Sequence, residues 1–369
     1  MSEVAEQSEY NEIAIRTAKA LSDARGTHAR QFEDREFPRE AFFPLDRAGL
    51  GVALEYERMG NQPVSEGLAA RAAKLGVEFE HVGLTLGTTL HGIQIASMNS
   101  PEEIAFLRDV LLERKVIFFR GQELTESEHI GFGRHFGDLD AFPFGEQGEN
   151  PYILEIRHGP RSPGTENAWH TDVTWMERPS LGSIAQCIRM PPAGGDTLFS
   201  DSHACYLGLP RKLQEELEWI VGINDYRYFL GLPGGGRLPD DLVDGIKQEI
   251  PFGVHHPLLR THPETGKTAL YFNLGFLRPD SLYDVRSGEA VGEKRSYSLV
   301  RRIASQHSRP EYACRFAWEP GSVAFWDNRA VQHYASSDYY PHKRLLRRVT
   351  VSGDRPFYEP HRPYTRDGR

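Results

Sequence analysis

From residue 150 onward, the chain reads as short β-strand segments separated by proline and glycine turns. In this part of the chain, apolar residues at helical spacing predict helices near 210–221 and 292–306. Short strands with this punctuation are typical of a β-sandwich or a jelly roll. The sequence therefore predicts a mainly β fold with a few flanking helices.

The part before residue 150 carries clearer helix signals. Residues 100–103 (SPEE) and 125–128 (TESE) each match a capping box at the start of a helix. Residues 115–120 (KVIFFR) predict a buried strand, and residues 84–95 (LTLGTTLHGIQI) predict two short strands around a turn. Residues 1–78 show weak periodicity. We expect them to form an N-terminal extension of unknown function, followed by one domain over 79–369.

Composition excludes several classes of protein. The net charge of −9 argues against a nucleic-acid or membrane-surface binder. No apolar run is long enough for a membrane-spanning helix, and the acidic N-terminus does not match a secretory signal. The three cysteines are widely spaced and odd in number, which favours free thiols in a reducing compartment. We expect a cytoplasmic protein.

A histidine and an aspartate stand two residues apart in AWHTDVTW, at His170 and Asp172. In a strand, this spacing would place both side chains on one face, where they could share a metal ion. The pair alone is a weak signal, because a hydrogen-bonded core or surface histidine is more common than a ligand. His262 and Glu264 have the same spacing but lie in THPETGK, which we interpret as a structural turn.

The C-terminal region adds a second group of polar residues on predicted strands. Strands are expected at 322–326, 330–334 and 345–351, with a turn at 327–329. His333 lies on the second strand, and alternation places Arg344 and Arg348 on one face next to the third. The segment HKRLLRR could also be a basic patch, but its interleaved leucines favour a strand.

Together these residues could complete a metal site. His170, Asp172 and His333 would supply two imidazoles and one carboxylate, which is the ligand set of non-heme Fe(II) oxygenases. Such a site leaves positions open for a chelating oxoacid and for dioxygen. The far carboxylate of the oxoacid then needs a fixed cation, which Arg344 could supply as a bidentate fork. The hydroxyl of Thr197, after a Gly-Gly turn, could donate a second hydrogen bond, and Arg348 would remain for a substrate anion.

Three sequence blocks resemble the TauD/TfdA family of Fe(II)- and 2-oxoglutarate-dependent dioxygenases. They are WHTDVTW, PPAGGDTLFSD and PGSVAFWDNRAVQHYASSDYYPHKRLLRRVTVSGDRPF, and the resemblance covers about 79–358. It implies a double-stranded β-helix (jelly roll) and the use of Fe(II), 2-oxoglutarate and O2, with release of succinate and CO2. By this resemblance the iron ligands are His170, Asp172 and His333, the oxoglutarate-binding residues are Thr197 and Arg344, and the residue for the substrate anion is Arg348.

The chain departs from the taurine-specific pattern at two positions. Phe142 replaces a histidine that contacts the sulfonate, and Glu166 replaces an asparagine near the taurine amine. These changes argue against taurine itself. Val173 and Phe272 are further candidates for substrate contact. We expect a small organic anion as substrate, namely a sulfonate, a sulfate ester or an aryloxy or other carboxylate, with C–S or C–O cleavage as one outcome.

Other interpretations stay open at this point. A biosynthetic hydroxylase or desaturase that acts on an amino acid or a natural-product intermediate would use the same residues. A metal-binding scaffold without turnover would also use the triad, but the triad and oxoacid positions are all intact. A zinc hydrolase would use the triad too, but it lacks a general base nearby and leaves Arg344 without a role. We also expect assembly into a homo-oligomer.

Overall fold

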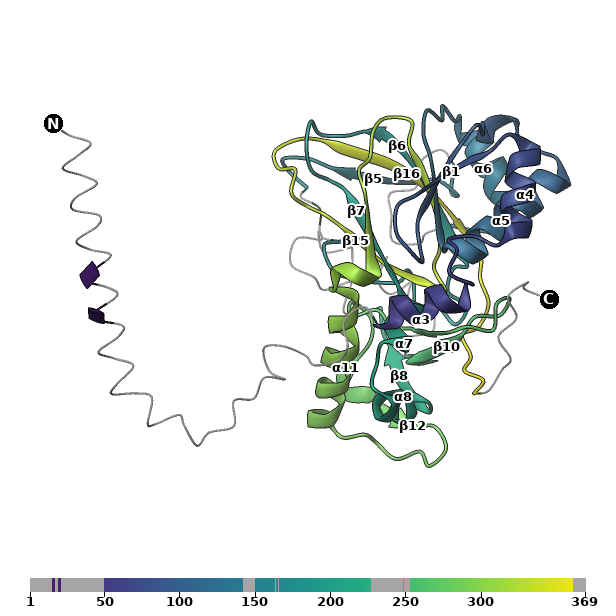
Figure 1. Cartoon of the computed structure of the whole chain (residues 1–369). Coiled ribbons are helices and arrows are strands. Elements are labelled where there is room, and N and C mark those ends of the chain that lie inside the picture. Colours follow the sequence, from purple (N-terminus) through teal and green to yellow (C-terminus); the bar gives the residue numbers. More distant parts are fainter. Residues whose placement is uncertain are drawn as a thin grey trace. The chain divides into compact units, whose positions relative to one another are not determined.

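The computed structural model describes residues 15–16, 19–20, 50–141, 150–162, 164, 166–226, 248 and 253–360. The chain divides into two compact units, Met1–Leu45 and Asp46–Arg369. In the first unit, only the helical residues 15–16 and 19–20 are described. The second unit carries all the elements named below (Figure 1).

The largest sheet has eight strands, with β5 attached to β16 at one side. Its strand order is β1 (Glu78–His81), β2 (Thr88–His91), β3 (Val116–Phe119), β14 (Val323–Asp327), β6 (Gly182–Arg189), β16 (Arg344–Val351) and β4 (Leu139–Asp140), and β5 spans Leu154–His158. Every pairing is antiparallel except that of β2 with β3. The predicted strands at 115–120, 322–326 and 345–351 are therefore confirmed as β3, β14 and β16.

A three-stranded sheet packs against the large one. It consists of β13 (Ala313–Phe316), β7 (Thr197–Asp201) and β15 (Val331–Ala335), all antiparallel. Phe118 of β3 stacks on Phe316 of β13 with ring centroids 4.1 Å apart, and Phe199 of β7 contacts Trp326 of β14. Burial of these aromatic faces between the two sheets provides the driving force for their packing. The arrangement is the jelly roll that the sequence predicted.

A second core lies under helix α11 (Glu293–His307). Leu299, Val300 and Ile303 of this helix are buried at helical spacing. They share this core with residues of α7 (Ser202–Leu207), α8 (Arg211–Leu217), β8 (Ile220–Asn224), β10 (Leu259–Thr261), β11 (Thr268–Leu270) and η3 (Pro310–Tyr312). The other elements of this part of the chain are β9 (Val254–Pro257), η2 (Pro279–Ser281) and β12 (Tyr283–Asp284). The helices expected near 210–221 and 292–306 are confirmed as α8 and α11.

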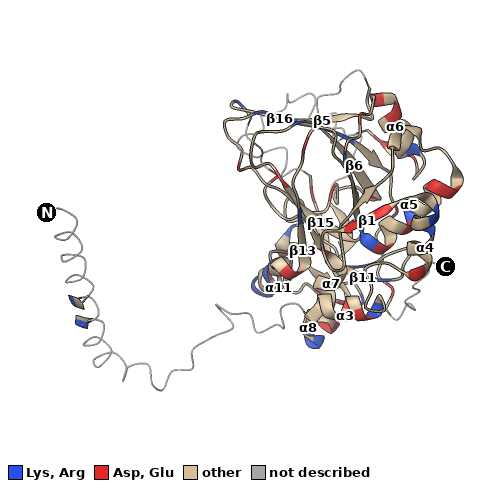
Figure 2. Ribbon diagram, turned by 45° about the horizontal axis from the view of Figure 1, so that its top comes forward, with Lys and Arg blue, Asp and Glu red and all other residues tan. Residues whose placement is uncertain are grey.

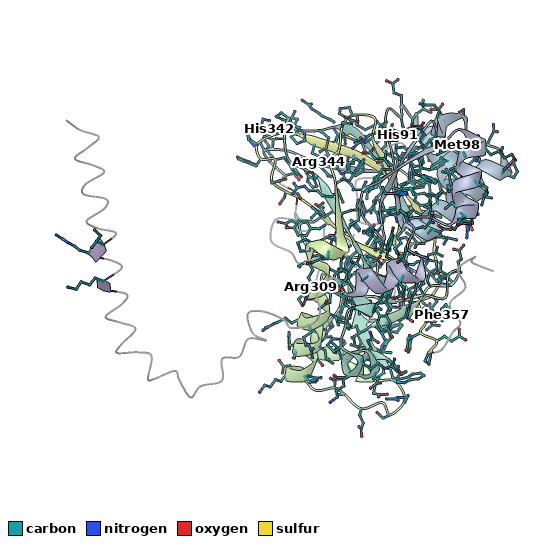
Figure 3. All side chains as sticks on the ribbon, viewed as in Figure 1. His91, Met98, Arg309, His342, Arg344 and Phe357 are labelled. Atoms are coloured by element: carbon teal, nitrogen blue, oxygen red, sulfur yellow. The ribbon has the colours of Figure 1, made fainter. Side chains whose placement is uncertain are left out.

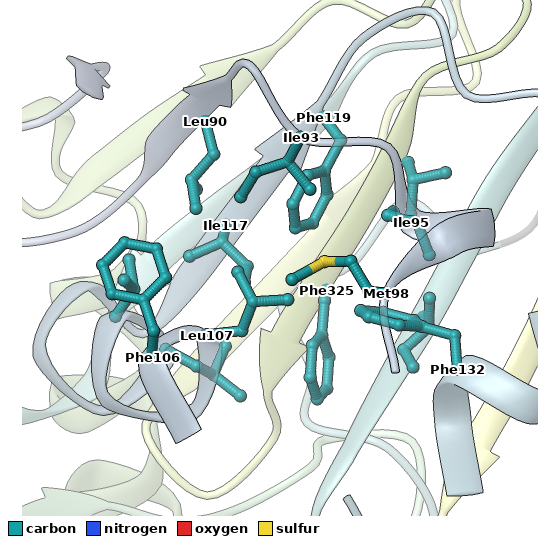
Figure 4. Close-up of a cluster of buried hydrophobic side chains, with 14 of the residues drawn as sticks. Leu90, Ile93, Ile95, Met98, Phe106, Leu107, Ile117, Phe119, Phe132 and Phe325 are labelled. Atoms are coloured by element: carbon teal, nitrogen blue, oxygen red, sulfur yellow. The ribbon is translucent and has the colours of Figure 1, made fainter. Parts of the chain in front are cut away.

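Three helices cover the outer face of the large sheet: α4 (Glu66–Leu75), α5 (Pro101–Arg114) and α6 (Glu126–Arg134), with η1 (Ile95–Ser97) beside them. Figure 4 shows Leu107 of α5 and Phe132 of α6 against Ile117 and Phe325 of the sheet. Both capping boxes are present, at Ser100–Glu103 and at Thr125–Glu128. In Figure 2, many of the charged residues lie on the helices, whereas the ribbon of the strands is mostly tan.

The segment 50–77 precedes the domain boundary that the sequence predicted at residue 78. Its helices α3 (Leu50–Arg58) and α4 belong to the second compact unit. Leu68 and Ala72 of α4 are buried in the core of the large sheet. Glu55 of α3 is fully buried and pairs with Lys115 and Lys267 at 3.3 Å and 2.6 Å. These contacts attach both helices to the jelly roll, and a function for residues 1–78 stays unassigned.

The prediction of two strands in residues 84–95 is wrong. Only β2 forms there, and its antiparallel partner is β1, which precedes the segment. Residues 82–86 bend instead, because their carbonyl oxygens bind the buried guanidinium of Arg114: Leu84 at 2.9 Å and Leu86 at 3.0 Å. A tertiary hydrogen-bond partner has replaced strand pairing.

Among the described residues, no helix has the length and apolar character needed to cross a membrane.

Replacement of Phe325 by alanine tests the core beneath the helices. Phe325 is fully buried, and its ring centroid lies 4.7 Å from that of Phe136. We expect the change to lower the free energy of unfolding by about 3–5 kcal/mol. Tyr297→Ala on α11 removes an exposed aromatic ring as a matched control, and its effect should stay within about 0.5 kcal/mol. Urea unfolding followed by circular dichroism measures both, and equal losses would contradict this packing.

Candidate active site

A pair of main-chain hydrogen bonds joins the two candidate histidines. The amide of His170 donates to the carbonyl of His333 at 3.0 Å, and the amide of His333 donates back at 2.8 Å. The two imidazole rings therefore lie side by side, with centroids 4.1 Å apart. Residues that are far apart in sequence thus meet at one edge of the smaller sheet.

Asp172 completes the group. Its Oδ1 atom lies 3.8 Å from Nε2 of His170 and 3.8 Å from Nε2 of His333. In the part of the chain that the structure describes, this is the only cluster of three or more histidine, cysteine, aspartate or glutamate side chains that could hold a metal ion. The sequence analysis named the same three residues as candidate ligands, and the fold places their side chains together.

The strand interpretation of AWHTDVTW is wrong, although the side chains of its His170 and Asp172 do meet. Only His170 pairs as in a strand, and residues 172–175 form a turn. Val173 within this turn has a φ of 48°, which a β-branched residue rarely adopts. The turn rotates the carboxylate of Asp172 toward the histidines, so the approach of the side chains arises from a turn and not from strand alternation.

The orientation of His170 and the burial of His333 suit metal binding. Nδ1–H of His170 donates to the carbonyl of Ala168 at 2.7 Å, so its Nε2 atom faces Asp172. Burial lowers the pKa of His333 to about 3, with a further decrease from the nearby His170. His333 is therefore neutral at physiological pH. A neutral imidazole with a free nitrogen is the form that binds metals.

Asp172 is held as a carboxylate. Burial opposes its ionisation, but the positive charge of Arg348 and a hydrogen bond from Ser183 outweigh that cost and lower the pKa of its carboxyl group to about 2. Nη1 of Arg348 lies 3.2 Å from Oδ2, and the hydroxyl of Ser183 donates to the same oxygen at 3.3 Å. Oδ1 is left facing the imidazoles. Two imidazoles and one carboxylate are a ligand set that fits an Fe(II) ion well.

Arg344 and Thr197 approach each other from opposite sheets. Arg344 begins β16 of the large sheet (Figure 3), and its Nε donates to the carbonyl of Gly195 at 3.1 Å, two residues before Thr197. Nη2 of Arg344 is buried and has no hydrogen-bond partner among the described residues. The hydroxyl of Thr197 accepts from Nε1 of Trp318 at 2.9 Å, so its own hydrogen is free to donate elsewhere. Nη2 of Arg344 and the hydroxyl of Thr197 are thus two buried donors that could bind an acceptor such as a carboxylate.

The other candidate substrate residues are spread around this region. Glu166 is half exposed, and its Oε2 lies 3.3 Å from Nε2 of His158. Val173 is buried in the turn of Asp172. Phe272 is buried in the core under α11, where its ring faces that of His307 at 5.6 Å. Phe142 lies outside the described residues, as do residues 231–241, a glycine-rich segment.

The similarly spaced His262 is structural, as its turn predicted. Its Nε2 lies 3.0 Å from Oδ2 of Asp327, and its Nδ1 accepts from the amides of Glu264 and Thr265. Both ring nitrogens are therefore occupied within the protein. The pair His262 and Glu264 forms no metal site.

Sequence reasoning missed the residues that support the ligands. Asn328 binds the main chain of Asp172 through its side chain, and Ser183 binds the Asp172 carboxylate. Asn328 was assigned only to the turn between two strands. Its position, five residues before His333 on the same hairpin, is the signal that could have revealed it.

The site can now be compared with known proteins. The family profile "Taurine catabolism dioxygenase TauD, TfdA family" matches residues 78–350. An alkylsulfatase from Acinetobacter baylyi is 32% identical over 73% of this chain and 83% of its own length. An alpha-ketoglutarate-dependent sulfate ester dioxygenase from Pseudomonas putida is 31% identical over 78% of this chain and 94% of its own.

A solved structure leads to the same family. The crystal structure of a taurine dioxygenase from Burkholderia xenovorans superimposes with a TM-score of 0.63, at 32% identity, over 78% of this chain and 92% of that one. Residues 78–350, which the family profile matches, contain the His-Asp-His cluster and both arginines. The chain therefore belongs to the TauD, TfdA family, and it is a dioxygenase that depends on Fe(II) and 2-oxoglutarate and consumes O2.

Proposed function

We propose that this enzyme hydroxylates a C–H bond of a small monoanionic substrate, with alkyl sulfate esters as the first class to test. The buried charges support a monoanion. Arg344 and Arg348 each bring one positive charge, and Asp172 is the buried carboxylate that pairs with Arg348. Fe(II) adds two more positive charges, which leaves three. A 2-oxoglutarate dianion balances two of them, and a monoanionic substrate balances the third, as a buried site requires.

We infer that His170, Asp172 and His333 hold the iron, and that Arg344 and Thr197 hold the far carboxylate of 2-oxoglutarate. The unpartnered Nη2 of Arg344 and the free hydroxyl hydrogen of Thr197 support the second assignment. Both groups are buried, so a carboxylate there would form charge-assisted hydrogen bonds away from water. The ring of Tyr339, with its centroid 5.9 Å from the Arg344 guanidinium, restricts where that group can point.

Arg348 is our candidate for the substrate anion. It lies beside Asp172, so an anion bound to it would place the substrate next to the iron. When Asp172 shares its charge with a divalent ion, its attraction for Arg348 decreases. Arg348 then has charge available for a second anion.

Bound Fe(II), with 2-oxoglutarate, activates O2, releases succinate and CO2, and supplies the oxidant for C–H hydroxylation. The protein contributes positions and charges. Arg348 orients the substrate, and the buried side chains around the turn of Asp172 limit access of water. If the hydroxylated carbon carries a sulfate ester oxygen, the hydroxylated product collapses to an aldehyde and sulfate.

Two of the relatives support sulfate esters, since one is an alkylsulfatase and the other a sulfate ester dioxygenase. Phe142, in place of the sulfonate-binding histidine, supports a substrate other than taurine. A cytoplasmic location and assembly into a homo-oligomer stay predictions of the sequence.

A substrate panel tests the proposed class. Alkyl sulfates, alkyl sulfonates, taurine, aryloxyacetates and amino acids are each incubated with the enzyme, Fe(II), 2-oxoglutarate and O2. We expect alkyl sulfates to give the largest release of succinate over background, with one sulfate ion per succinate. Turnover of amino acids alone would overturn the proposal in favour of a biosynthetic hydroxylase.

The metal ligands are tested by His170→Ala and Asp172→Ala. Each change removes one of three ligands, so we expect loss of detectable Fe(II) binding in anaerobic isothermal titration calorimetry, with activity falling to background. His91→Ala is the matched control, because His91 is exposed, lies outside the candidate site and pairs with Glu80 of the neighbouring strand β1. Full iron binding in both ligand variants would rule out this assignment.

Arg344 and Arg348 lie on one face of one strand and make a crossed test. We expect Arg348→Ala to raise the KM for substrate by at least about 30-fold and the KM for 2-oxoglutarate by less than about 3-fold, at saturating iron. Arg344→Ala should do the reverse.

Arg347→Ala is the control for this pair. Arg347 lies between the two arginines on the opposite face, half-buried, and pairs with Glu126 and Glu155. Both KM values should stay near those of the unmodified enzyme. If Arg348→Ala mainly weakens the binding of 2-oxoglutarate, the roles proposed for the two arginines are interchanged.

A further inference from the structure

The side chain of Asn328 forms hydrogen bonds with the main chain of Asp172, one of the proposed iron ligands. Its side chain is buried with 1% exposure. Oδ1 accepts from the amide of Asp172 at 2.7 Å, and Nδ2 donates to the carbonyl of Asp172 at 3.1 Å. One carboxamide thus satisfies both main-chain polar groups of a single residue. This is the pattern that a neighbouring strand would provide.

The position of this contact explains why it is needed. Strand pairing between the two histidines stops at His170, so Asp172 has no strand beside it. A buried amide and carbonyl without partners would be costly. Asn328 replaces the missing strand and does so at the ligand.

Further contacts fix the carboxamide itself. Nδ2 of Asn328 also lies 3.3 Å from the carbonyl and 3.1 Å from the hydroxyl of Ser180. The hydroxyl of Thr171 donates to the main-chain carbonyl of Asn328 at 2.6 Å and lies 2.8 Å from its Oδ1. The amide of Asn328 donates to the carbonyl of Leu181 at 2.8 Å. The side chain therefore has one orientation.

The turn at residues 172–175, which Asn328 holds, has a strained backbone. Val173 follows Asp172 directly and has a φ of 48°, a left-handed conformation that is unfavourable for a β-branched residue. Such a conformation persists only where surrounding contacts hold it. Asn328 acts on one side of the turn, and Asn273 acts on the other by donating to the carbonyl of Thr171 at 2.7 Å.

We propose that Asn328 is a positioning residue for the iron site, which keeps the Asp172 turn in the conformation that presents the carboxylate to His170 and His333. Asn328 touches neither the metal nor the substrate and acts through the main chain of Asp172. The inference rests on the proposed role of the triad as iron ligands.

The test compares Fe(II) binding by apo-enzyme variants in anaerobic titration calorimetry. We expect Asn328→Ala to weaken Fe(II) binding by about 10- to 100-fold, the usual effect of losing a residue that orients a metal ligand. The visible absorption band formed with Fe(II) and 2-oxoglutarate should require correspondingly more iron for half-saturation.

Gln122→Ala is the matched control. Gln122 is also a buried carboxamide that bridges main-chain groups, from Ile93, Ile95 and Arg120, but it contacts no residue of the triad. It should lower the Tm while leaving Fe(II) affinity within about 2-fold. Equal effects of both variants on Fe(II) affinity would mean that Asn328 acts through general stability, which overturns the proposal.

Repeating Asn328→Ala in a Val173→Gly enzyme distinguishes the loss of support for the strained turn from the loss of hydrogen bonds alone. Glycine adopts a positive φ without cost, so in a Val173→Gly enzyme the turn needs less support. We expect Asn328→Ala to weaken Fe(II) binding several-fold less in that background than in the unmodified chain. An undiminished effect would contradict a role in holding the strained turn.

Two further outcomes are kept distinct. If Asn328→Ala does not fold, Thr171→Val decides, because it removes only the hydroxyl that bonds to Asn328; unchanged Fe(II) affinity there would overturn the proposal. If the unmodified enzyme itself binds no Fe(II), the proposed role of the triad fails, and with it the basis of this inference.

Discussion

The hydrogen-bonded pairing of His170 with His333 is the interaction on which the site depends. It joins the segment before the Asp172 turn to a strand more than 160 residues later, and it sets both imidazoles side by side. The jelly roll makes this possible, because β15 lies at the edge of the smaller sheet and has an open side there. The His-Asp-His cluster forms where pairing at the edge of the smaller sheet extends by one residue pair, His170 with His333.

Buried charge is the second constraint. Arg344 and Arg348 are inserted between the two sheets, where water cannot solvate them fully. Among the described residues, Arg348 pairs with a carboxylate in the site, and that carboxylate is the one that we propose as an iron ligand. The protein thus maintains an excess of positive charge that its small anionic ligands relieve. This links affinity for 2-oxoglutarate and for substrate to the charge of the metal.

Local signals in the sequence predicted much of this structure. Capping boxes fixed the starts of α5 and α6, and alternation in RLLRR placed Arg344 and Arg348 on one face of β16. The triad was identified from residue types and order. The turn at Asp172 could not be predicted, because its unusual Val173 conformation is stabilised by Asn328 and Asn273 from distant segments. The strand expected from residue 84 was wrong for the same reason, since Arg114 holds residues 84–86 through tertiary hydrogen bonds.

The most direct measurement is an anaerobic titration of the apo-enzyme with Fe(II) and then 2-oxoglutarate, followed by addition of an alkyl sulfate, with the visible metal-to-ligand charge-transfer band as the readout. Our account predicts that the band appears only when both Fe(II) and 2-oxoglutarate are present, and that the alkyl sulfate shifts it. The shift would show that the anion lies close enough to the iron to change its coordination. Absence of the band in correctly folded enzyme would contradict the assignment of His170, Asp172, His333 and Arg344 to an iron–oxoglutarate site.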